Sequence, residues 1–325
     1  MPGDESGEEG SAAGGVTVRQ ARASDAEAVA AFTEDTWDEF EGSDYVPDVF
    51  EEWVANDGED QHTVVAERET PDGDRVVGCC QVVRLSDHEA WTQGIRVHPD
   101  HRGAGVGRAM DAACRAWAPE RGATVARNMV FSWNEQGLAT ARSLGYGPRT
   151  EFRWAHPEPD PDATVSGDGS GRGADAARTV TDDPDAVWGY WQRSDARDAL
   201  GGLALDPAET WALSEWTRER THRAAAETAV FAVRRDGTTG AAWRTRVTER
   251  DDGDWAEYGG AGWETLADAR ALFRAIERDA AAVGAERVRV LIPETPRHVS
   301  DAAAAGVTLA DDPDFVFEAD LTASR

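Results

Sequence analysis

The chain has 325 residues and a formal net charge of −29, from 62 acidic and 33 basic residues. Such a surface repels phosphate backbones and anionic lipids, so nucleic acid and membranes are excluded as expected partners. No apolar run approaches the roughly 20 residues of a spanning helix, and the acidic N-terminus lacks the basic and apolar regions of a signal peptide. We therefore expect a cytoplasmic protein that is long enough for two domains.

Every basic residue is arginine, and the acids are spread over both halves of the chain. This composition resembles that of acidic haloarchaeal proteins and indicates adaptation to high intracellular salt. The chain has three cysteines, an odd number, in apolar surroundings: Cys79, Cys80 and Cys114. This predicts buried, reduced thiols. The seven histidines show no ligand spacing, so we expect no metal.

The first part of the chain reads as an acidic tail followed by one domain. Residues 1–15 are rich in glycine and acid and are expected to be disordered. The domain spans residues 16–155. It opens with a strand, two helices and a hairpin, which we predict at residues 16–19, 25–37, 46–56, 63–67 and 76–84.

A short apolar strand, a glycine-rich turn and a helix follow at residues 91–117. Gly103, Gly105 and Gly107 remove Cβ atoms where the helix begins, and the first amides of a helix have no intrahelical partner. These amides and the positive end of the helix dipole predict a site for an anion such as a phosphate. A Walker loop is excluded because the chain has no lysine, and the spacing of the glycines does not fit a dinucleotide fingerprint.

The turn resembles the acyl-coenzyme A turn of the GNAT acyltransferases, Arg/Gln-x-x-Gly-x-Gly/Ala after a Val-x-Pro strand end. The residues that match are Arg102, Gly105 and Gly107, with Val97 and Pro99 before them. A strand predicted at residues 124–131 is followed by a second GNAT signature. Its matching residues are Asn134, Gly145 and the aromatic Tyr146. Two motifs in the right order make residues 16–155 similar to a GNAT domain.

The resemblance implies an α/β (α+β) fold, a mixed, mostly antiparallel central sheet flanked by helices. It implies an N-acetyltransferase that moves an acyl group from acetyl-CoA, its co-substrate, directly to an amine. The end of the strand would pair with the pantetheine arm, the turn would hold the pyrophosphate, and a backbone amide near Ile95 or Arg96 would stabilise the oxyanion. The implied coenzyme-binding residues are Ile95, Arg96, Val97, Arg102, Gly103, Ala104, Gly105, Val106, Gly107, Arg108 and Asn134.

The sequence departs from the family at both positions that handle protons. The tyrosine that often protonates the thiolate falls on Ala141, and the strand glutamate falls on Gln93. Glu89 is a candidate base acting through a water, and Ser132 is a candidate proton donor. Structural alternatives are a solvated hairpin residue for Glu89 and a helix cap for Ser132.

Acceptor recognition in this family usually comes from the segment between the first two helices, here residues 34–45. Its acids suit a cationic amine on a small molecule or a peptide. The alternative is that they are surface acids around core anchors at Trp37 and Phe40. Whether the chain is a monomer or a homodimer stays open.

A second copy of the domain is predicted at residues 178–325, after a linker at residues 156–177. It repeats the strand and hairpin at residues 179–180, 229–233 and 240–247, and the helix and strand at residues 265–283 and 287–292. The positions that match residues 102–107 are 264–269, where Glu264 replaces the arginine and no glycine remains. Residues 259–262, Gly-Gly-Ala-Gly, are an alternative turn just upstream.

We therefore expect tandem GNAT-like domains in which the second is degenerate and supports the first. A site for another ligand in the second domain is the alternative. Ala141 and Gln93 also leave open a non-catalytic acyl-CoA binding or sensing protein. A purely structural partner, in which both domains only mediate assembly, is the remaining hypothesis.

Overall fold

The structure is a computed structural model that describes residues 10–12, 15–34, 36, 44–70, 73–164, 178–250 and 252–322. Most of the predicted acceptor segment, with Trp37 and Phe40, lies outside the described residues, as do most of residues 1–15 and residues 165–177 of the linker. No helix in the described ranges is both long and apolar enough to cross a bilayer.

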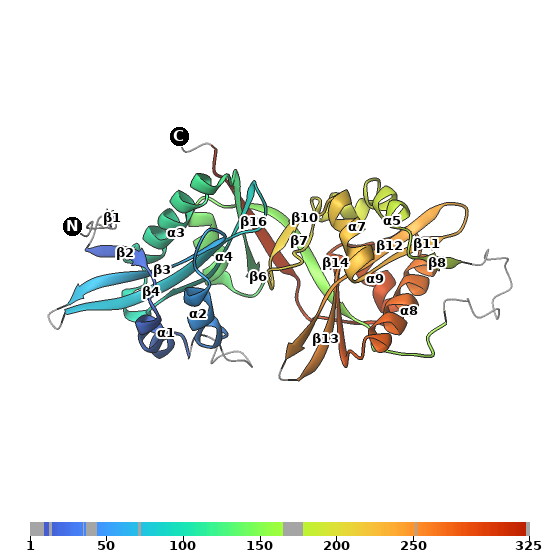
Figure 1. Ribbon diagram of the computed structural model, residues 1–325, viewed down its shortest axis with the longest axis horizontal. Coiled ribbons are helices and arrows are strands. Elements are labelled where there is room, and N and C mark those ends of the chain that lie inside the picture. Colours follow the sequence, from blue (N-terminus) through green and yellow to red (C-terminus); the bar gives the residue numbers. More distant parts are fainter. Residues whose placement is uncertain are drawn as a thin grey trace, which may run out of the picture. The chain divides into compact units, whose positions relative to one another are not determined.

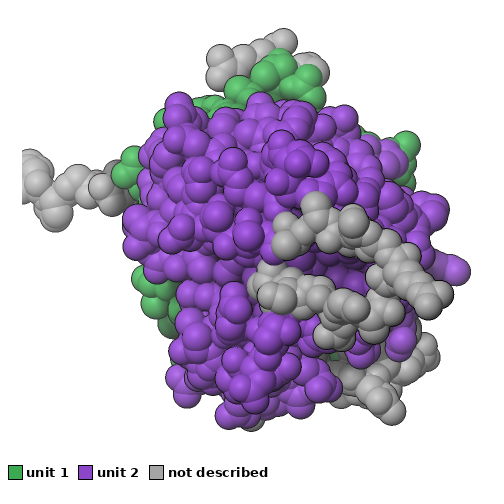
Figure 2. Space-filling model, turned by 90° about the vertical axis from the view of Figure 1, so that its right-hand side faces the viewer, with its two compact units in different colours: residues 1–128, 140–147, 318–325 green, residues 129–139, 148–317 purple. Residues whose placement is uncertain are grey.

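The chain divides into two compact units, coloured separately in Figure 2. Unit 1 comprises residues 1–128, 140–147 and 318–325, and unit 2 comprises residues 129–139 and 148–317. The boundaries of these units therefore differ from the predicted domain boundary at residue 155. Almost all of the strand that follows the second signature belongs to unit 2, and the C-terminal residues belong to unit 1.

Unit 1 is a sheet with the strand order β1-β2-β3-β4-β5-β6. Neighbours are antiparallel except β5 and β6, which are parallel. The elements are β1 (Gly10–Ala12), β2 (Val16–Gln20), α1 (Ala26–Thr33), α2 (Val46–Ala55), β3 (Gln61–Thr70), β4 (Gly73–Arg84), β5 (Glu89–Val97), α3 (Val106–Trp117), β6 (Val125–Phe131) and α4 (Glu135–Ser143). Both β6 and α4 divide between the units, and so does the strand at Asp314–Asp320, β16.

The helices of unit 1 cover both faces of its sheet (Figure 1). Cys79 packs with Val29 and Phe50 from α1 and α2. Successive strand residues point to opposite faces, so Cys80 points toward α3, where its sulfur lies 3.8 Å from that of Cys114. All three cysteines are buried and free, which confirms the prediction of reduced thiols.

Unit 2 repeats this arrangement with the strand order β8-β11-β12-β13-β14-β7, and β15 also pairs with β7. Only β13 and β14 are parallel among these neighbours. The elements are β7 (Gly147–His156), β8 (Thr179–Thr181), α5 (Pro184–Trp191), α6 (Asp195–Ala199), β9 (Leu203–Leu205), β10 (Leu213–Glu215), α7 (Arg218–Glu227), β11 (Ala229–Arg234), β12 (Thr238–Arg250), β13 (Gly253–Trp263), α8 (Leu266–Ala282), β14 (Arg287–Pro293), α9 (Pro296–Ala304), β15 (Thr308–Leu309) and β16 (Asp314–Asp320). The order β13-α8-β14 matches β5-α3-β6, as the predicted duplication requires.

The alternative turn of the second copy is not formed. Residues 259–262 lie inside β13, where residues 260–262 pair with β12 and Gly259 falls at a bulge. The glycines serve close packing instead. A Cβ atom at Gly260 would lie 2.7 Å from the ring of Trp243, and one at Gly259 would lie 2.2 Å from the Thr245 hydroxyl. Trp243 in turn stacks on Trp216, with ring centroids 4.4 Å apart.

A buried carboxyl in unit 2 makes stability depend on pH. Burial raises the pKa of Asp314 from its ordinary value of 3.8 to about 7. Between about pH 4 and 7 the unfolded chain loses a proton that the folded chain keeps, so this residue lowers stability as pH rises through that window. We expect Asp314→Asn to remove this loss. Urea unfolding gives the difference in the free energy of unfolding, variant minus wild type. This difference should rise from about pH 4 to 7 and then level off. A difference that does not change with pH would contradict this.

Candidate functional site

The turn between β5 and α3 is built on glycines in the left-handed region of backbone space. Gly103 has φ 74° and Gly105 has φ 82°. A Cβ atom at either position would meet nothing within 4 Å, so the space beside the turn is open. Glycine is therefore required here by backbone conformation, since other residues rarely adopt positive φ.

This turn leaves a run of amides free at the start of α3. The first hydrogen bond of the helix joins the Ala109 amide to the Gly105 carbonyl, at 3.0 Å. Within the described part of the chain, the backbone amides of residues 103–108 have no hydrogen-bond acceptor, and no side chain caps the helix. Adjacent amides at the positive end of a helix dipole can bind an anion such as a pyrophosphate.

Arginines lie on either side of these amides. Arg102 is exposed, and its Nε donates to the Val97 carbonyl at 3.3 Å. Arg108 is also exposed, and its guanidinium donates to the Ser143 carbonyl at 3.0 Å. A Cβ atom at Gly107 would lie 3.6 Å from the Ile95 side chain, so the first turn of α3 packs closely over the end of β5.

A β-bulge interrupts β5 just before this point. The register passes from Gln81–Gln93 to Cys79–Arg96, so Gly94 and Ile95 together face a single residue of β4. Gly94 has φ 62°, and a Cβ atom there would lie 2.5 Å from the ring of Trp53. A bulge changes the direction of the backbone groups that follow it, here those of Ile95 and Arg96.

The side chain of Arg96 holds α2 beside the bulge. Its Nε and Nη2 atoms donate to the two oxygens of Asp44 at 2.5 and 3.0 Å. Asp44 is buried and also accepts the Val46 amide at 3.1 Å, at the start of α2. This ion pair occupies the Arg96 guanidinium, so the part of Arg96 left to act on a ligand is its backbone.

Comparisons with known proteins agree with this geometry. Residues 27–146 match the model of the acetyltransferase (GNAT) family. The chain therefore contains a GNAT acetyltransferase domain. No curated protein matches the sequence.

Solved structures extend the likeness beyond the GNAT domain. A GCN5-related N-acetyltransferase from Sphaerobacter thermophilus is 16% identical with a TM-score of 0.57, and the match covers 94% of this chain and 96% of that one. A tandem GNAT protein from the clavulanic acid biosynthesis pathway is 16% identical with a TM-score of 0.51, and the match covers 94% of this chain and 98% of that one. At such identities the likeness shows the fold, which is confirmed as tandem GNAT-like over most of the chain.

The GNAT domain brings together most of the residues predicted to bind the coenzyme. The end of β5, the turn and the start of α3 place them along one continuous stretch; they are Ile95, Arg96, Val97, Arg102, Gly103, Ala104, Gly105, Val106, Gly107 and Arg108. Asn134 is different, because it belongs to unit 2 and the turn belongs to unit 1. Its role at the pantetheine arm stays a prediction.

The cap of α4 is made by Asn134 and not by Ser132. The Asn134 Oδ1 atom accepts the Gly137 amide at 2.8 Å, which is the hydrogen bond of an N-cap. Ser132 lies two residues earlier, and its amide donates to the Pro313 carbonyl at 3.4 Å. The structural alternative for Ser132 is therefore wrong, and its role as a proton donor stays a prediction.

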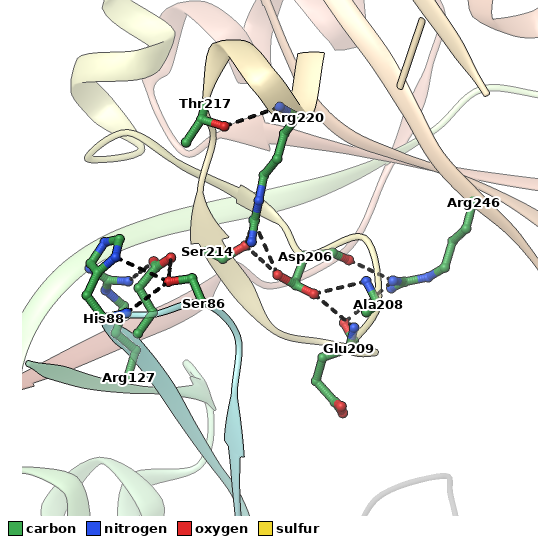
Figure 3. Close-up of polar contacts among 11 residues, drawn as sticks. Ser86, His88, Arg127, Asp206, Ala208, Glu209, Ser214, Thr217, Arg220 and Arg246 are labelled. Carbon is green, nitrogen blue, oxygen red and sulfur yellow. Dashed lines mark hydrogen bonds and ion pairs between the residues drawn. The ribbon is translucent and has the colours of Figure 1, made fainter. Parts of the chain in front are cut away.

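Glu89 is buried and ion-paired. It is therefore not a solvated hairpin residue, and it is not accessible as a base. It is 1% exposed, and it accepts hydrogen bonds from Arg127 at 2.5 Å and from the Ser86 hydroxyl at 2.9 Å. Arg127 continues the cluster to Glu318 at 2.7 Å; Figure 3 shows Ser86 and Arg127. Glu89 begins β5, six residues before Ile95, which is about 20 Å along a strand. We therefore assign Glu89 a structural role.

Sequence reasoning missed a buried polar cluster against α3. The Tyr146 hydroxyl donates to Asp111 at 3.0 Å and lies 3.2 Å from the Thr92 hydroxyl. Burial raises the pKa of Asp111 and of Tyr146. The signal in the sequence was an acid next to Met110 on the apolar stripe of α3. The cluster ties the second signature to α3 and β5.

At the family's glutamate position, Gln93 joins a row of hydrogen-bonded side chains that crosses the sheet and ends at Asp57. Its amide donates to Gln81 at 2.7 Å, and the amide of Gln81 donates to the Thr63 hydroxyl at 3.3 Å. Thr63 donates to Asp57 at 2.9 Å. Ala141, at the family's tyrosine position, is 4% exposed. Neither position carries an ionisable group.

In unit 2 the start of the corresponding helix is closed. Thr265 caps α8 and forms a capping box with Asp268, in which each side chain accepts the amide of the other residue. Burial would raise the pKa of Asp268, but hydrogen bonds from Thr265, Arg178 and Thr239 outweigh this and hold the pKa below its ordinary value. The helix start therefore already holds a carboxylate, so Asp268, more directly than Glu264, explains the loss of the anion site.

Proposed function

We propose that the protein is an acetyl-CoA-dependent N-acetyltransferase with its active site in unit 1. The observation that carries this proposal is the uncapped start of α3, where the amides of residues 103–108 have no acceptor among the described residues. The polyanionic end of coenzyme A fits these amides together with Arg102 and Arg108. The matching helix of unit 2 supports the assignment, because there the side chains of Thr265 and Asp268 accept each other's amides and place a carboxylate at the helix start.

The residues of β5 would orient the reaction. Backbone groups of Ile95, Arg96 and Val97 would pair with the pantetheine arm as a neighbouring strand does. An amide at the bulge after Gly94 would donate to the carbonyl oxygen as its charge develops. The bound thioester supplies an activated acyl carbon. The amine nitrogen forms a bond to this carbon and the carbon–sulfur bond breaks. The amine loses one proton and the leaving thiolate takes up one, so the products are the amide and the free thiol of coenzyme A.

The route of that proton does not use Glu89 in this proposal. Glu89 is tied to Arg127, and Gln93 holds a neutral amide where the family often has a glutamate. Ser132 remains the candidate donor to the leaving thiolate. The acceptor would be an amine on a small molecule or a peptide. Tyr45, at the end of the predicted acceptor segment, has its ring centroid 6.1 Å from that of Trp53, and the Trp53 ring lies beside Gly94 of the bulge.

The absence of ionisable groups at positions 93 and 141 favours a second candidate, a non-catalytic acyl-CoA binding or sensing protein. A screen of amines with acetyl-CoA at high salt separates the two. With thiol release followed by a thiol-reactive dye, we expect release that depends on one class of amine and is lost in Gly105→Glu. Tight coenzyme binding without turnover on any amine would support the sensing protein instead.

A further inference from the structure

Unit 2 contains a small cavity of its own. Its volume is about 250 Å³, and it is lined by Tyr190, Arg193, Ser194, Asp195, Glu264 and Arg297. This volume is below the roughly 300–1,000 Å³ of sites for drug-sized ligands. The cavity therefore suits a small molecule and is too small for coenzyme A.

The cavity lies at the positions of the second repeat that correspond to the coenzyme and acceptor regions of the first. Glu264 matches Arg102 of the coenzyme turn. Arg297 lies in the first turn of α9, which matches the helix of the second signature. Arg193 and Ser194 lie between α5 and α6, as the predicted acceptor segment lies between α1 and α2, and Asp195 begins α6. The cavity therefore lies at the positions that correspond to the predicted ligand site of the first repeat.

The charges around the cavity balance, which is unusual in a chain of net charge −29. The lining residues include two arginines, Arg193 and Arg297, and two acids, Asp195 and Glu264. Arg297 is fixed in place, because its guanidinium donates to Asp195 at 2.6 Å and to the Glu264 carbonyl at 3.3 Å. Asp195 is thereby neutralised, whereas the Glu264 side chain is exposed and has no hydrogen-bond or ion-pair partner among the described residues.

Donors for an anionic group are also present. The Arg297 side chain is 38% exposed, so its outer guanidinium nitrogens can be reached from the cavity, whereas its Nε atom is buried. The Tyr190 side chain is 2% exposed and contributes to the cavity wall.

We propose that this cavity binds a small zwitterion of the amino-acid class. Its carboxylate would accept from Arg297 and Tyr190, and its ammonium would contact the Glu264 carboxylate. A phosphate-bearing ligand is disfavoured, because Glu264 and the carboxylate of Asp268 at the start of α8 repel further negative charge. The second unit would then sense a metabolite.

Calorimetric titration of the full chain with each of the L-amino acids tests this. We expect at least one to bind with a Kd in the millimolar range or tighter. Glu264→Gln should weaken that binding by about tenfold or more, because a charge-assisted contact is lost. Glu227→Gln, which removes an equal charge from an exposed position of α7 outside the cavity, should leave it unchanged.

Three results would overturn the proposal. One is the absence of binding by every amino acid in a preparation that binds acetyl-CoA. The second is equal binding by the wild type and Glu264→Gln, which would place the amino acid elsewhere, for instance as an acceptor in unit 1. The third is equal binding of the amino acid and of its analogue without the amino group, which would show that the ammonium makes no contact.

Discussion

Replacing Gly105 by glutamate is expected to weaken acetyl-CoA binding at least about 100-fold, since hydrogen bonds to charged groups are worth about 1.5–3 kcal/mol each. The new carboxylate would stand at the N-cap of α3, where it would compete for the free amides and repel the pyrophosphate. Equilibrium binding of a fluorescent coenzyme A analogue, displaced by acetyl-CoA, measures the effect.

Gly284→Glu is the matched control for this substitution. Gly284 also has positive φ, 77°, and a Cβ atom there would meet nothing within 4 Å, so the backbone strain and the added charge are the same. It follows α8 in unit 2, away from the α3 turn in sequence and unit. Gly284→Glu should bind acetyl-CoA as the wild type does. Equal losses in the two variants would mean that the effect reports strain and not a coenzyme site.

Arg127→Met is expected to lower the free energy of unfolding by about 3–5 kcal/mol, because it leaves a buried carboxylate without its partner. The side chains of Arg127 and Glu89 are 4% and 2% exposed. Urea unfolding measures the loss. The double replacement Glu89→Leu with Arg127→Met should recover much of it, since an apolar pair of similar size avoids the unpaired charge. A double variant as unstable as Arg127→Met would contradict this assignment.

The role of Glu89 in the reaction can be separated from its role in the fold. Glu89→Gln keeps the shape of the side chain and can still accept from Arg127. If Glu89 is structural, this variant loses stability but keeps the wild-type pH profile of kcat/KM once an acceptor is known. If it is a base, kcat falls steeply and the profile loses its acid limb. We expect the first outcome.

Local features of the sequence predicted the glycine turn before α3 well. Gly103 and Gly105 take positive φ, and glycine is the residue that does so freely, so spacing alone identified the turn. The apolar stripe of α3 was equally local. In the second repeat, Thr265 and Asp268 have the spacing of a capping box, so the closed helix start is a local feature as well.

Contacts between distant residues could not be predicted in this way. Glu89 meets Arg127 across 38 positions, and Arg127 meets Glu318 across 191. The residues next to Glu89 in the sequence give no sign of Arg127 or Glu318. An acid that follows a hairpin is therefore expected to be exposed to solvent. The pairing of β7 with β14 is a further example. It joins a strand predicted for the first repeat to a strand of the second, so a domain boundary placed between the repeats could not show it.

The number of acetyl-CoA molecules bound per chain tests the central claim most directly, because the chain carries the same helix start twice, once open and once closed. Calorimetric titration of the wild-type protein should give a stoichiometry of one, with the site lost in Gly105→Glu. A stoichiometry of two, or a single site that survives Gly105→Glu, would contradict the account.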